Sequence, residues 1–533
     1  MSSASHLSSI TTIIEFLLRE HSDEVTKVTE MCRHISPSSF NTATSYLNIQ
    51  TAFRNTMQSL TTENLSLLEF LTALSKDTEF VAHFNRLVSL YETAQESNYD
   101  SVDVPEITKV VRDVLSYIRR NPTYSQWVTF FKKMGTSWSA ELSSSIPSHI
   151  YNERTRTAIH TKFITLFISV IVNGVVHFRK LRQWDNDPTL LNGFFSSQLR
   201  DNPQSRVLIS SMLWYMVSAF MGIIIYYNTI FTDTEVNLYR CGGESGQWFL
   251  NICYVYIDHL IDGDVTLGYT TDADKKKFLR YVQERLHSHV EPFDQPTALM
   301  NRICTDLEKR IPRGDDAGGD TGRIWEYVLR VFECEQIGIH LEKSSKHIDG
   351  LPIDKQDTLL SSLLMEKGMT TVYLTVLFVL YENELEPTRL ISCCDSDCSI
   401  YDISYKLGAL SQYVDDLNDF HNDLRANSLT YAVHRYRTDG NLDRYIQEVN
   451  AYMRLVEDSL GEIPMMGWML YVCQTGILYG CIKNSTYITS DTYVSIQKML
   501  RRHHIDEKHV MTMRQRKNTD GLAYLSNAFI ALG

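Results

Sequence analysis

Apolar residues recur at three- and four-residue steps along most of the chain, which is the period of amphipathic helices. In the first third the pattern is clearest at 10–18, 65–74, 80–90 and 110–118. Strand-like alternation is rare, and the 533 residues include few glycines (24) and prolines (12). The pattern predicts an all-α protein, with residues 1–160 as a helical accessory region and residues 161–533 as a second helical domain.

One apolar run, residues 207–232, contains no charged residue. It is long enough to span a bilayer. A helix that is apolar on all sides can instead lie at the centre of a large helical bundle. Serines and tyrosines interrupt the run, and no basic loop beside it gives an orientation. We prefer the buried core helix and keep the membrane span as the alternative.

The charge and cysteine content narrow the function classes. The formal net charge is −13, from 51 basic and 64 acidic residues, whereas tracking a phosphate backbone needs clustered lysine and arginine. A nucleic-acid partner is therefore not expected. The ten cysteines do not form the dense pattern of a disulfide scaffold, and the first residues lack the features of a secretory signal. We therefore expect a cytoplasmic protein with reduced thiols.

Three aspartates recur at every fourth residue in the stretch 410–431: Asp415, Asp419 and Asp423. On a helix this spacing stacks the carboxylates along one side, where like charges repel. A solvated acidic surface is the simplest explanation. Apolar neighbours and the arginines that follow instead favour a partly buried site, in which a hard cation such as Mg²⁺ joins the carboxylates to a phosphorylated ligand.

A second acidic pair lies earlier in the chain. Asp258 and Asp262 are again four residues apart, in a helical pattern that ends near Asp264. Such a pair alone is a weak signal, because it occurs on many helix surfaces. Two acidic helices that face each other across one cavity would form a more specific metal site.

Gly368 lies inside a long apolar helical pattern, directly after Lys367. A glycine there costs about 1 kcal/mol relative to alanine, and it usually marks a close backbone approach or a kink. The ammonium group of Lys367 can pair with a phosphate or with a carboxylate. The alternative is that this lysine only extends its charged end to solvent.

Four of these features occur in the order found in the large (class IB) terpene synthases, typified by the bacterial tetraprenyl-β-curcumene synthase family. They are the CGG of 241–243, the first aspartate motif, the Lys367–Gly368 pair and the three later aspartates. The resemblance covers about residues 235–485. The chain departs from the family pattern at Gly263, which follows the first motif, and at Met369, where the family has a second glycine.

The resemblance implies a class I isoprenoid synthase helical bundle with an additional N-terminal helical region. It implies a trinuclear Mg²⁺ cluster, for which Mn²⁺ can substitute, held by Asp258, Asp262, Asp415, Asp419 and Asp423. Direct contacts to the substrate diphosphate are assigned to Arg425, Lys367 and Arg435. The cavity would be lined by Trp248, Phe249, Tyr256 and Tyr413.

The implied activity is Mg²⁺-dependent ionisation of a linear prenyl diphosphate, such as farnesyl, geranylgeranyl or a longer chain. Diphosphate leaves, and the carbocation becomes a cyclic or linear terpene hydrocarbon or alcohol. A head-to-head or chain-elongating synthase similar to squalene and phytoene synthases is the alternative within the superfamily. An acidic helical adaptor without catalysis is the alternative outside it. Peripheral membrane contact fits an apolar substrate, whereas an integral membrane prenyltransferase is disfavoured by the shortage of further long apolar runs.

Overall fold

The structure is a computed structural model of the chain. It describes residues 10–34, 67–96, 103–130, 132–133, 172–173, 175–176, 179–180, 183–184, 186–190, 271–313, 320–343, 348, 350–386, 390–393, 396–460 and 466–502. The observations below concern these residues.

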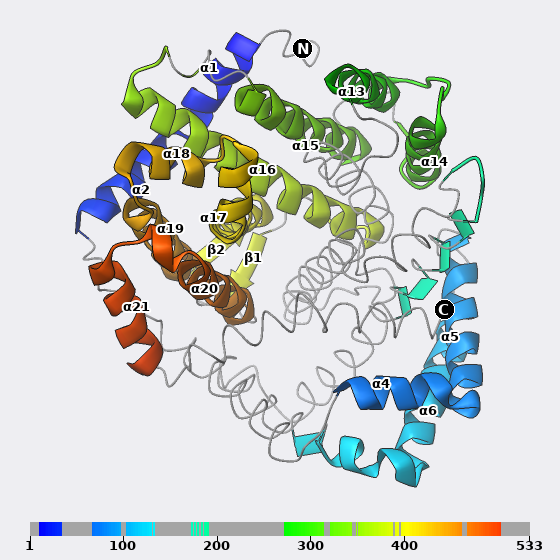
Figure 1. Cartoon of the computed structure of the whole chain (residues 1–533). Helices are drawn as coiled ribbons and strands as arrows, with labels where there is room; N and C mark the ends of the chain where they lie inside the picture. The colour runs from blue at the N-terminus through cyan, green and yellow to red at the C-terminus, as the bar shows by residue number, and fades with distance from the viewer. Residues whose placement is uncertain are drawn as a thin grey trace.

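Helices make up most of the described chain, which confirms the predicted all-α class (Figure 1). The N-terminal part contains α1 (Ile10–Glu20), α2 (Ser22–His34), α4 (Leu67–Lys76), α5 (Thr78–Glu96), α6 (Val104–Arg120) and the 3₁₀ turn η1 (Pro122–Tyr124). After it come α13 (Asp272–His287), α14 (Gln295–Arg310), α15 (Asp320–Lys343) and α16 (Ile353–Glu382). The C-terminal part contains α17 (Ile400–Ala426), α18 (Tyr431–Asp439), α19 (Asp443–Leu460), α20 (Met466–Lys483), the 3₁₀ turn η4 (Ser485–Tyr487) and α21 (Ser490–Arg502).

A short antiparallel hairpin between α16 and α17 is a departure from the purely helical prediction. Its strands are β1 (Leu390–Cys393) and β2 (Ser396–Ser399), with Ile391 opposite Cys398 and Cys393 opposite Ser396. Ser399 then starts α17, because its hydroxyl accepts a hydrogen bond from the Asp402 amide at 3.0 Å. The hairpin therefore ends in the N-cap of α17.

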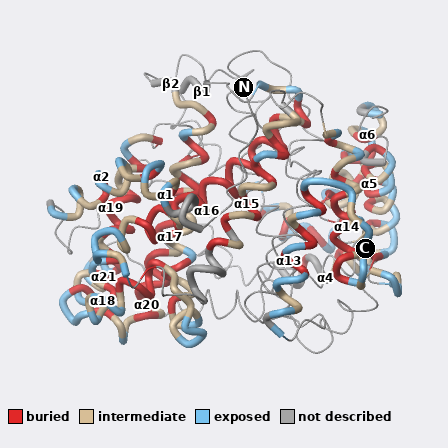
Figure 2. The backbone as a smooth tube through the Cα atoms, turned by 90° about the horizontal axis from the view of Figure 1, so that it is seen from above, coloured by how far each residue is buried: buried red, intermediate tan, exposed pale blue. Residues whose placement is uncertain are grey.

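The buried apolar residues divide into two clusters (Figure 2). The larger one, here called the main core, joins α13–α21 with Leu17 of α1 and Val28 of α2. The smaller one, the second core, joins α4–α6 and Trp127 with residues 172, 175 and 176. In Figure 1, α4–α6 lie at the lower right, apart from α16–α20.

These clusters cross the predicted boundary between 1–160 and 161–533 in both directions, since Leu17 and Val28 belong to the main core and residues 172, 175 and 176 belong to the second core. The first two helices pack on the main core, where His21 is 1% exposed. Its ring nitrogens lie 2.7 Å from Tyr405 Oη and 2.7 Å from Glu366 Oε2. Amphipathic periodicity predicts where the helices of the N-terminal region lie in the sequence, but it does not predict which other helices they pack against.

Helix α16 is long and apolar enough to cross a membrane by length and composition. In the 18-residue stretch of α16 that meets this criterion, 89% of the residues are buried inside the protein, as in the central helix of a bundle. The apolar run 207–232 lies outside the described residues.

Candidate functional site

The aspartates of the later motif lie on the C-terminal half of α17, as their spacing predicts. Asp415 is exposed, whereas Asp419 and Asp423 are half-buried. Asp416, which the sequence analysis did not select, is 8% exposed. It lies three residues before Asp419 and seven before Asp423, and this spacing puts it on the same side of the helix. We call this side the acidic face and define it as Asp415, Asp416, Asp419 and Asp423.

The carboxylate of Asp416 is buried and accepts hydrogen bonds from the side chain of Gln412 and from the backbone of Tyr431. Gln412 Nε2 donates to Asp416 Oδ1 at 3.1 Å and also lies 3.4 Å from Asp415 Oδ2. The pKa of Asp416 is raised to about 6. Burial is the largest cause and the nearby Asp419 adds to it, while Gln412, the Lys367 ammonium and the backbone hydrogen bond from Tyr431 act in the opposite direction. The acidic face therefore holds a buried carboxylate whose charge would be stabilised by another cation.

Two glycines bring α16 against α17. A Cβ atom on Gly368 would lie 2.1 Å from Gly408 O, and one on Gly408 would lie 2.3 Å from Gly368 O. The backbones are thus in direct contact, and the predicted close approach at Gly368 is confirmed. The crossing also brings Lys367 near enough to Asp416 to affect its pKa. The closeness of Lys367 to Asp416 favours a carboxylate, rather than a phosphate, as the partner of Lys367.

A second pair of glycines brings α20 against the opposite side of α17. A Cβ atom on Gly476 would lie 2.5 Å from Val414, and one on Gly480 would lie 2.7 Å from Leu417. Asn484 Nδ2 donates to Leu417 O at 2.7 Å and to Gly480 O at 2.9 Å. Helix α17 is therefore held between two closely packed helices, and its acidic face has a rigid support.

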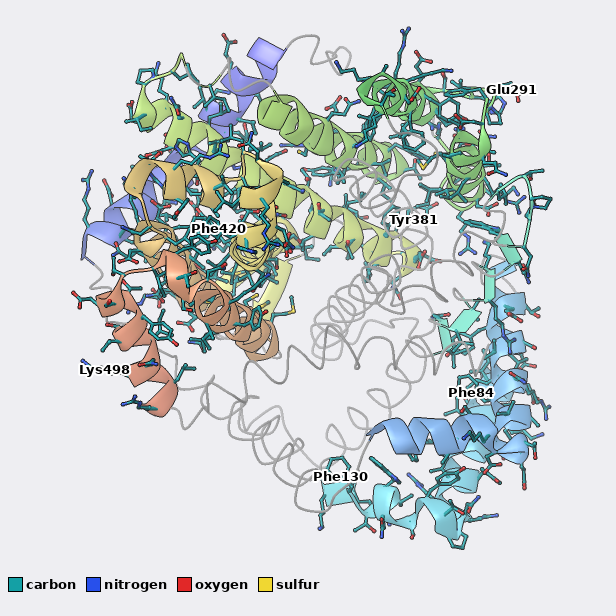
Figure 3. All side chains as sticks on the ribbon, viewed as in Figure 1. Phe84, Phe130, Glu291, Tyr381, Phe420 and Lys498 are labelled. Atoms are coloured by element: carbon teal, nitrogen blue, oxygen red, sulfur yellow. The ribbon has the colours of Figure 1, made fainter. Side chains whose placement is uncertain are left out.

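The aromatic rings next to this support are tightly packed. Phe420, labelled in Figure 3, meets Tyr436 and Tyr487 edge-on at centroid distances of 5.3 and 5.1 Å. Tyr413, a predicted cavity residue, is 1% exposed and packs against Tyr445 and Tyr452. The structure therefore gives Tyr413 the environment of a core residue.

Arg435, a predicted diphosphate contact, lies in a buried ion-pair network. Its Nη1 donates to Asp357 Oδ2 at 2.6 Å, its Nη2 to Glu448 Oε1 at 2.8 Å and its Nε to Tyr431 Oη at 2.9 Å. His434 Nε2 lies 2.8 Å from the other oxygen of Asp357. All three guanidinium nitrogens thus have protein acceptors, so we assign Arg435 a structural role and leave it out of the site.

The network also explains the ionisation of Asp357. Burial raises its pKa, but the hydrogen bonds and charges of His434 and Arg435 outweigh burial, and the net shift is downward. This is the opposite of the shift at Asp416, which is more deeply buried than Asp357. Arg425, the remaining predicted arginine, is exposed in the last turn of α17.

Several predicted site residues lie outside the described chain. They are Trp248, Phe249, Tyr256, Asp258 and Asp262. Among the residues that the structure describes, no group of three His, Cys, Asp or Glu side chains converges closely enough to hold a metal ion. The oxygen donors of the acidic face suit Mg²⁺ in kind, but this geometry requires further ligands from another part of the chain or from a bound substrate.

Six cysteines of the described chain are free thiols: Cys32, Cys304, Cys334, Cys398, Cys473 and Cys481. Cys304, Cys473 and Cys481 are buried, and burial raises the pKa of each to about 12. A thiolate is thus disfavoured at these positions, and these cysteines fit an inert packing role.

Comparison of the chain with protein-family models, with curated proteins and with solved structures finds no match.

Proposed function

We propose that the chain is a Mg²⁺-dependent class I terpene synthase that acts on a linear prenyl diphosphate. The observation that carries the proposal is the acidic face of α17, in which the buried Asp416 continues into the half-buried Asp419 and Asp423. A helix that serves only as a solvated surface has no reason to bury a carboxylate so deeply that its pKa is raised. A site for a divalent cation gives that carboxylate a partner.

The proposed fold is the class I isoprenoid synthase bundle with an additional N-terminal helical region. In support, α17 occupies a central position, in contact with α16, α18, α19 and α20. In such a bundle a second helix faces the acidic face across the cavity. We assign Asp258 and Asp262 to that helix, and Trp248, Phe249 and Tyr256 to the cavity wall.

In this proposal Asp415, Asp419 and Asp423 hold Mg²⁺ together with Asp258 and Asp262, and Asp416 adds negative charge behind them. When bound, the ions supply Lewis-acid stabilisation of the departing diphosphate. Lys367, at the glycine crossing, neutralises the acidic face before substrate binds and contacts the diphosphate afterwards. Arg425, at the open end of α17, provides a second cationic contact.

The chain's own groups also set the fate of the reacting carbon skeleton. The packed helices exclude water, which would otherwise intercept a carbocation. Aromatic faces stabilise positive charge electrostatically. The proposed partner is a prenyl diphosphate, and the proposed location is the cytoplasm, with the protein either soluble or in peripheral contact with the membrane that dissolves such substrates.

The test is release of diphosphate from farnesyl, geranylgeranyl and longer prenyl diphosphates, measured with Mg²⁺ and with EDTA. We expect Mg²⁺-dependent release, and a loss of about 100-fold or more in Asp419→Ala, as for removal of a major electrostatic contact. Asp402→Asn is the matched control, because Asp402 is an exposed acid on the same helix, far from the acidic face. Its rate should equal that of the wild-type chain.

The products separate the competing functions. A hydrocarbon or alcohol with the carbon number of the substrate supports a terpene synthase, whereas a doubled or extended chain supports a coupling enzyme. Absence of release from every substrate, with no Mg²⁺-dependent change in melting temperature, would leave an acidic helical binding protein.

A further inference from the structure

Helix α6 carries its exposed charges on the side opposite the one that it buries. The buried side packs in the second core and consists of Ile107, Val110, Val111 and Val114. At about 100° per residue, four exposed cations fall within an arc of about 100° that is centred on the opposite side of the helix. We call this side the basic face and define it as Lys109, Arg112, Arg119 and Arg120. It extends for about 16 Å along the helix axis.

The acids near the basic face are mostly engaged elsewhere. Glu106 lies at its edge and forms an ion pair with Arg86 of α5. Asp103 is the N-cap of α6 and accepts a hydrogen bond from the Glu106 amide at 2.9 Å. The half-buried Asp113 is the one further acid on α6. Among the described residues no ion pair joins a cation of the basic face to an acid, so this face presents a surplus of positive charge.

The sign of the basic face is opposite to that of the whole chain, whose formal net charge is −13. At physiological ionic strength the Debye length is about 8 Å, so distant acids are screened and the nearest charges decide which surfaces attract the protein. Figure 2 shows α5 and α6 at the edge of the molecule, where such a surface can reach them. Four gathered like charges also repel one another, and a polyanionic partner relieves that repulsion.

Two features indicate which kind of polyanion fits the basic face. It follows one straight helix, so its cations reach a flat anionic surface together. The exposed large apolar side chains of the described chain are Phe293, Ile353 and Val494, all outside α6. Contact through the basic face is therefore electrostatic, without insertion of an apolar side chain. An anionic bilayer has this shape and charge, and it attracts basic residues near its surface.

We propose that the basic face of α6 binds an anionic lipid bilayer by electrostatic attraction, and that the second core thereby holds the chain at the membrane surface. The choice of a bilayer over other anionic surfaces rests on the proposed function, because prenyl diphosphates are amphiphiles that partition into membranes. The inference adds the surface through which peripheral contact is made.

The experiment is co-sedimentation of the full chain with lipid vesicles, measured without prenyl substrate or Mg²⁺. Phosphatidylcholine vesicles with about one third phosphatidylserine should bind the chain, and pure phosphatidylcholine vesicles should not. Binding should weaken as salt rises from about 0.1 to about 0.5 M, because the charges are then screened. Each cation near the surface contributes about fivefold to affinity, so the double variant Lys109→Gln/Arg112→Gln should bind about 30-fold more weakly. Should this α6 double variant fail to fold, Arg119→Gln/Arg120→Gln replaces it with the same expectation.

Lys276→Gln/Lys355→Gln is the matched control. It removes two exposed lysines from α13 and α16, so it changes the net charge of the chain equally and leaves the basic face intact. Its affinity for the vesicles should stay within about twofold of wild type. Arg119→Lys/Arg120→Lys keeps both charges and should also stay within about twofold, because the attraction depends on charge and not on the geometry of a guanidinium group.

Three results would overturn the inference: equal binding to the two kinds of vesicle, an equal loss in the α6 double variant and in the control, or salt-sensitive self-association without vesicles that the α6 double variant abolishes. The last result would assign the basic face to a second copy of the chain.

Diphosphate release separates this inference from the proposed function. Measured without vesicles, on dispersed substrate, release should be equal in the wild-type chain and the α6 double variant, since the basic face lies outside the candidate site. Release without vesicle binding would reject the membrane surface alone. Vesicle binding without release would reject the proposed function and leave the membrane surface standing.

Discussion

Two aspartates, Asp77 beside the second core and Asp416 in the main core, have opposite environments. Asp77 lies between α4 and α5 and accepts from the hydroxyls of Tyr117 at 2.8 Å and Tyr124 at 2.7 Å. It also accepts from the amides of Glu79 and Phe80, each at 3.1 Å. Partial burial raises its pKa, but these donors outweigh burial, and the net shift is downward.

Asp416 shows the reverse balance, because burial dominates and raises its pKa to about 6. Gln412 and the backbone of Tyr431 hydrogen-bond it, and Lys367 lies near it, but they do not outweigh burial. The comparison teaches how to separate two kinds of carboxylate. One that is surrounded by fixed donors has a structural task, whereas a buried one whose donors do not outweigh burial is a candidate ligand for a cation.

The largest effect is expected where α16 meets α17. A substitution there tests whether the main core, which contains this contact, unfolds independently of the second core near Asp77. Gly368→Ala should destabilise the main core by about 3 kcal/mol or more, because its Cβ would meet the backbone of Gly408 rather than a movable side chain. Amide hydrogen exchange should increase in α16 and α17 and remain unchanged in α5 and α6.

Gly350→Ala is the control for that experiment, since a Cβ atom there meets nothing within 4 Å. It should leave stability within about 0.5 kcal/mol of wild type. Increased hydrogen exchange in α5 and α6 of the Gly368→Ala variant would contradict this prediction. It would show that the main core and the second core unfold as one unit.

The next effect concerns the charge of Asp416. The pKa of this group is raised from 3.8, the ordinary value of an aspartate, to about 6 in the folded protein, so the folded state binds its proton more tightly. Stability should therefore fall as pH rises from about 4 to about 6 and then stay low. Asp416→Asn removes this loss and should raise stability at pH 7.5 by up to about 3 kcal/mol, with little difference near pH 4.

Denaturant unfolding at the two pH values measures this change in the absence of divalent cations. A variant no more stable than wild type at pH 7.5 would mean that Lys367 and Gln412 already compensate the charge of Asp416. The acidic face would then need no further cation.

The smallest effect is expected at Asp77, with the opposite sign. Asp77→Ala should lower stability at pH 7 by about 1–2 kcal/mol, the usual cost of a lost helix cap. Because the folded pKa lies below the unfolded value, the charge-dependent part of this contribution is present above about pH 4 and is lost as pH falls further. The same unfolding series, repeated toward pH 3, checks this. A difference that does not shrink on acidification would show that the charge of Asp77 has no role.

Local pattern was sufficient to predict several parts of this molecule. The three-to-four period predicts the helices, and the four-residue spacing predicts that Asp415, Asp419 and Asp423 lie together on α17. Gly368 predicts a close backbone approach or a kink, because a glycine inside an apolar helix costs stability relative to alanine, and the structure shows the close approach. These features depend on residues close together in the sequence.

Features that depend on distant partners were not predictable in the same way. Arg435 follows the aspartates in sequence, yet its partner Asp357 is 78 residues away. The burial of Asp416 depends on how other helices pack around α17, although the adjacent pair Asp415–Asp416 offered a signal. The hairpin at 390–399 was missed because its strands have four residues each, too few for a period to show.

The buried contact of His21 with Glu366 has a consequence for synthesis of the chain. The two residues are 345 positions apart. At about 5 to 20 residues per second, the ribosome takes roughly 20 to 70 s to make the partner after His21 has appeared. During that interval Leu17 and Val28 have no main core on which to pack. The first two helices thus emerge well before the residues on which they dock, and chaperones that shield apolar helices should bind this segment on the nascent chain.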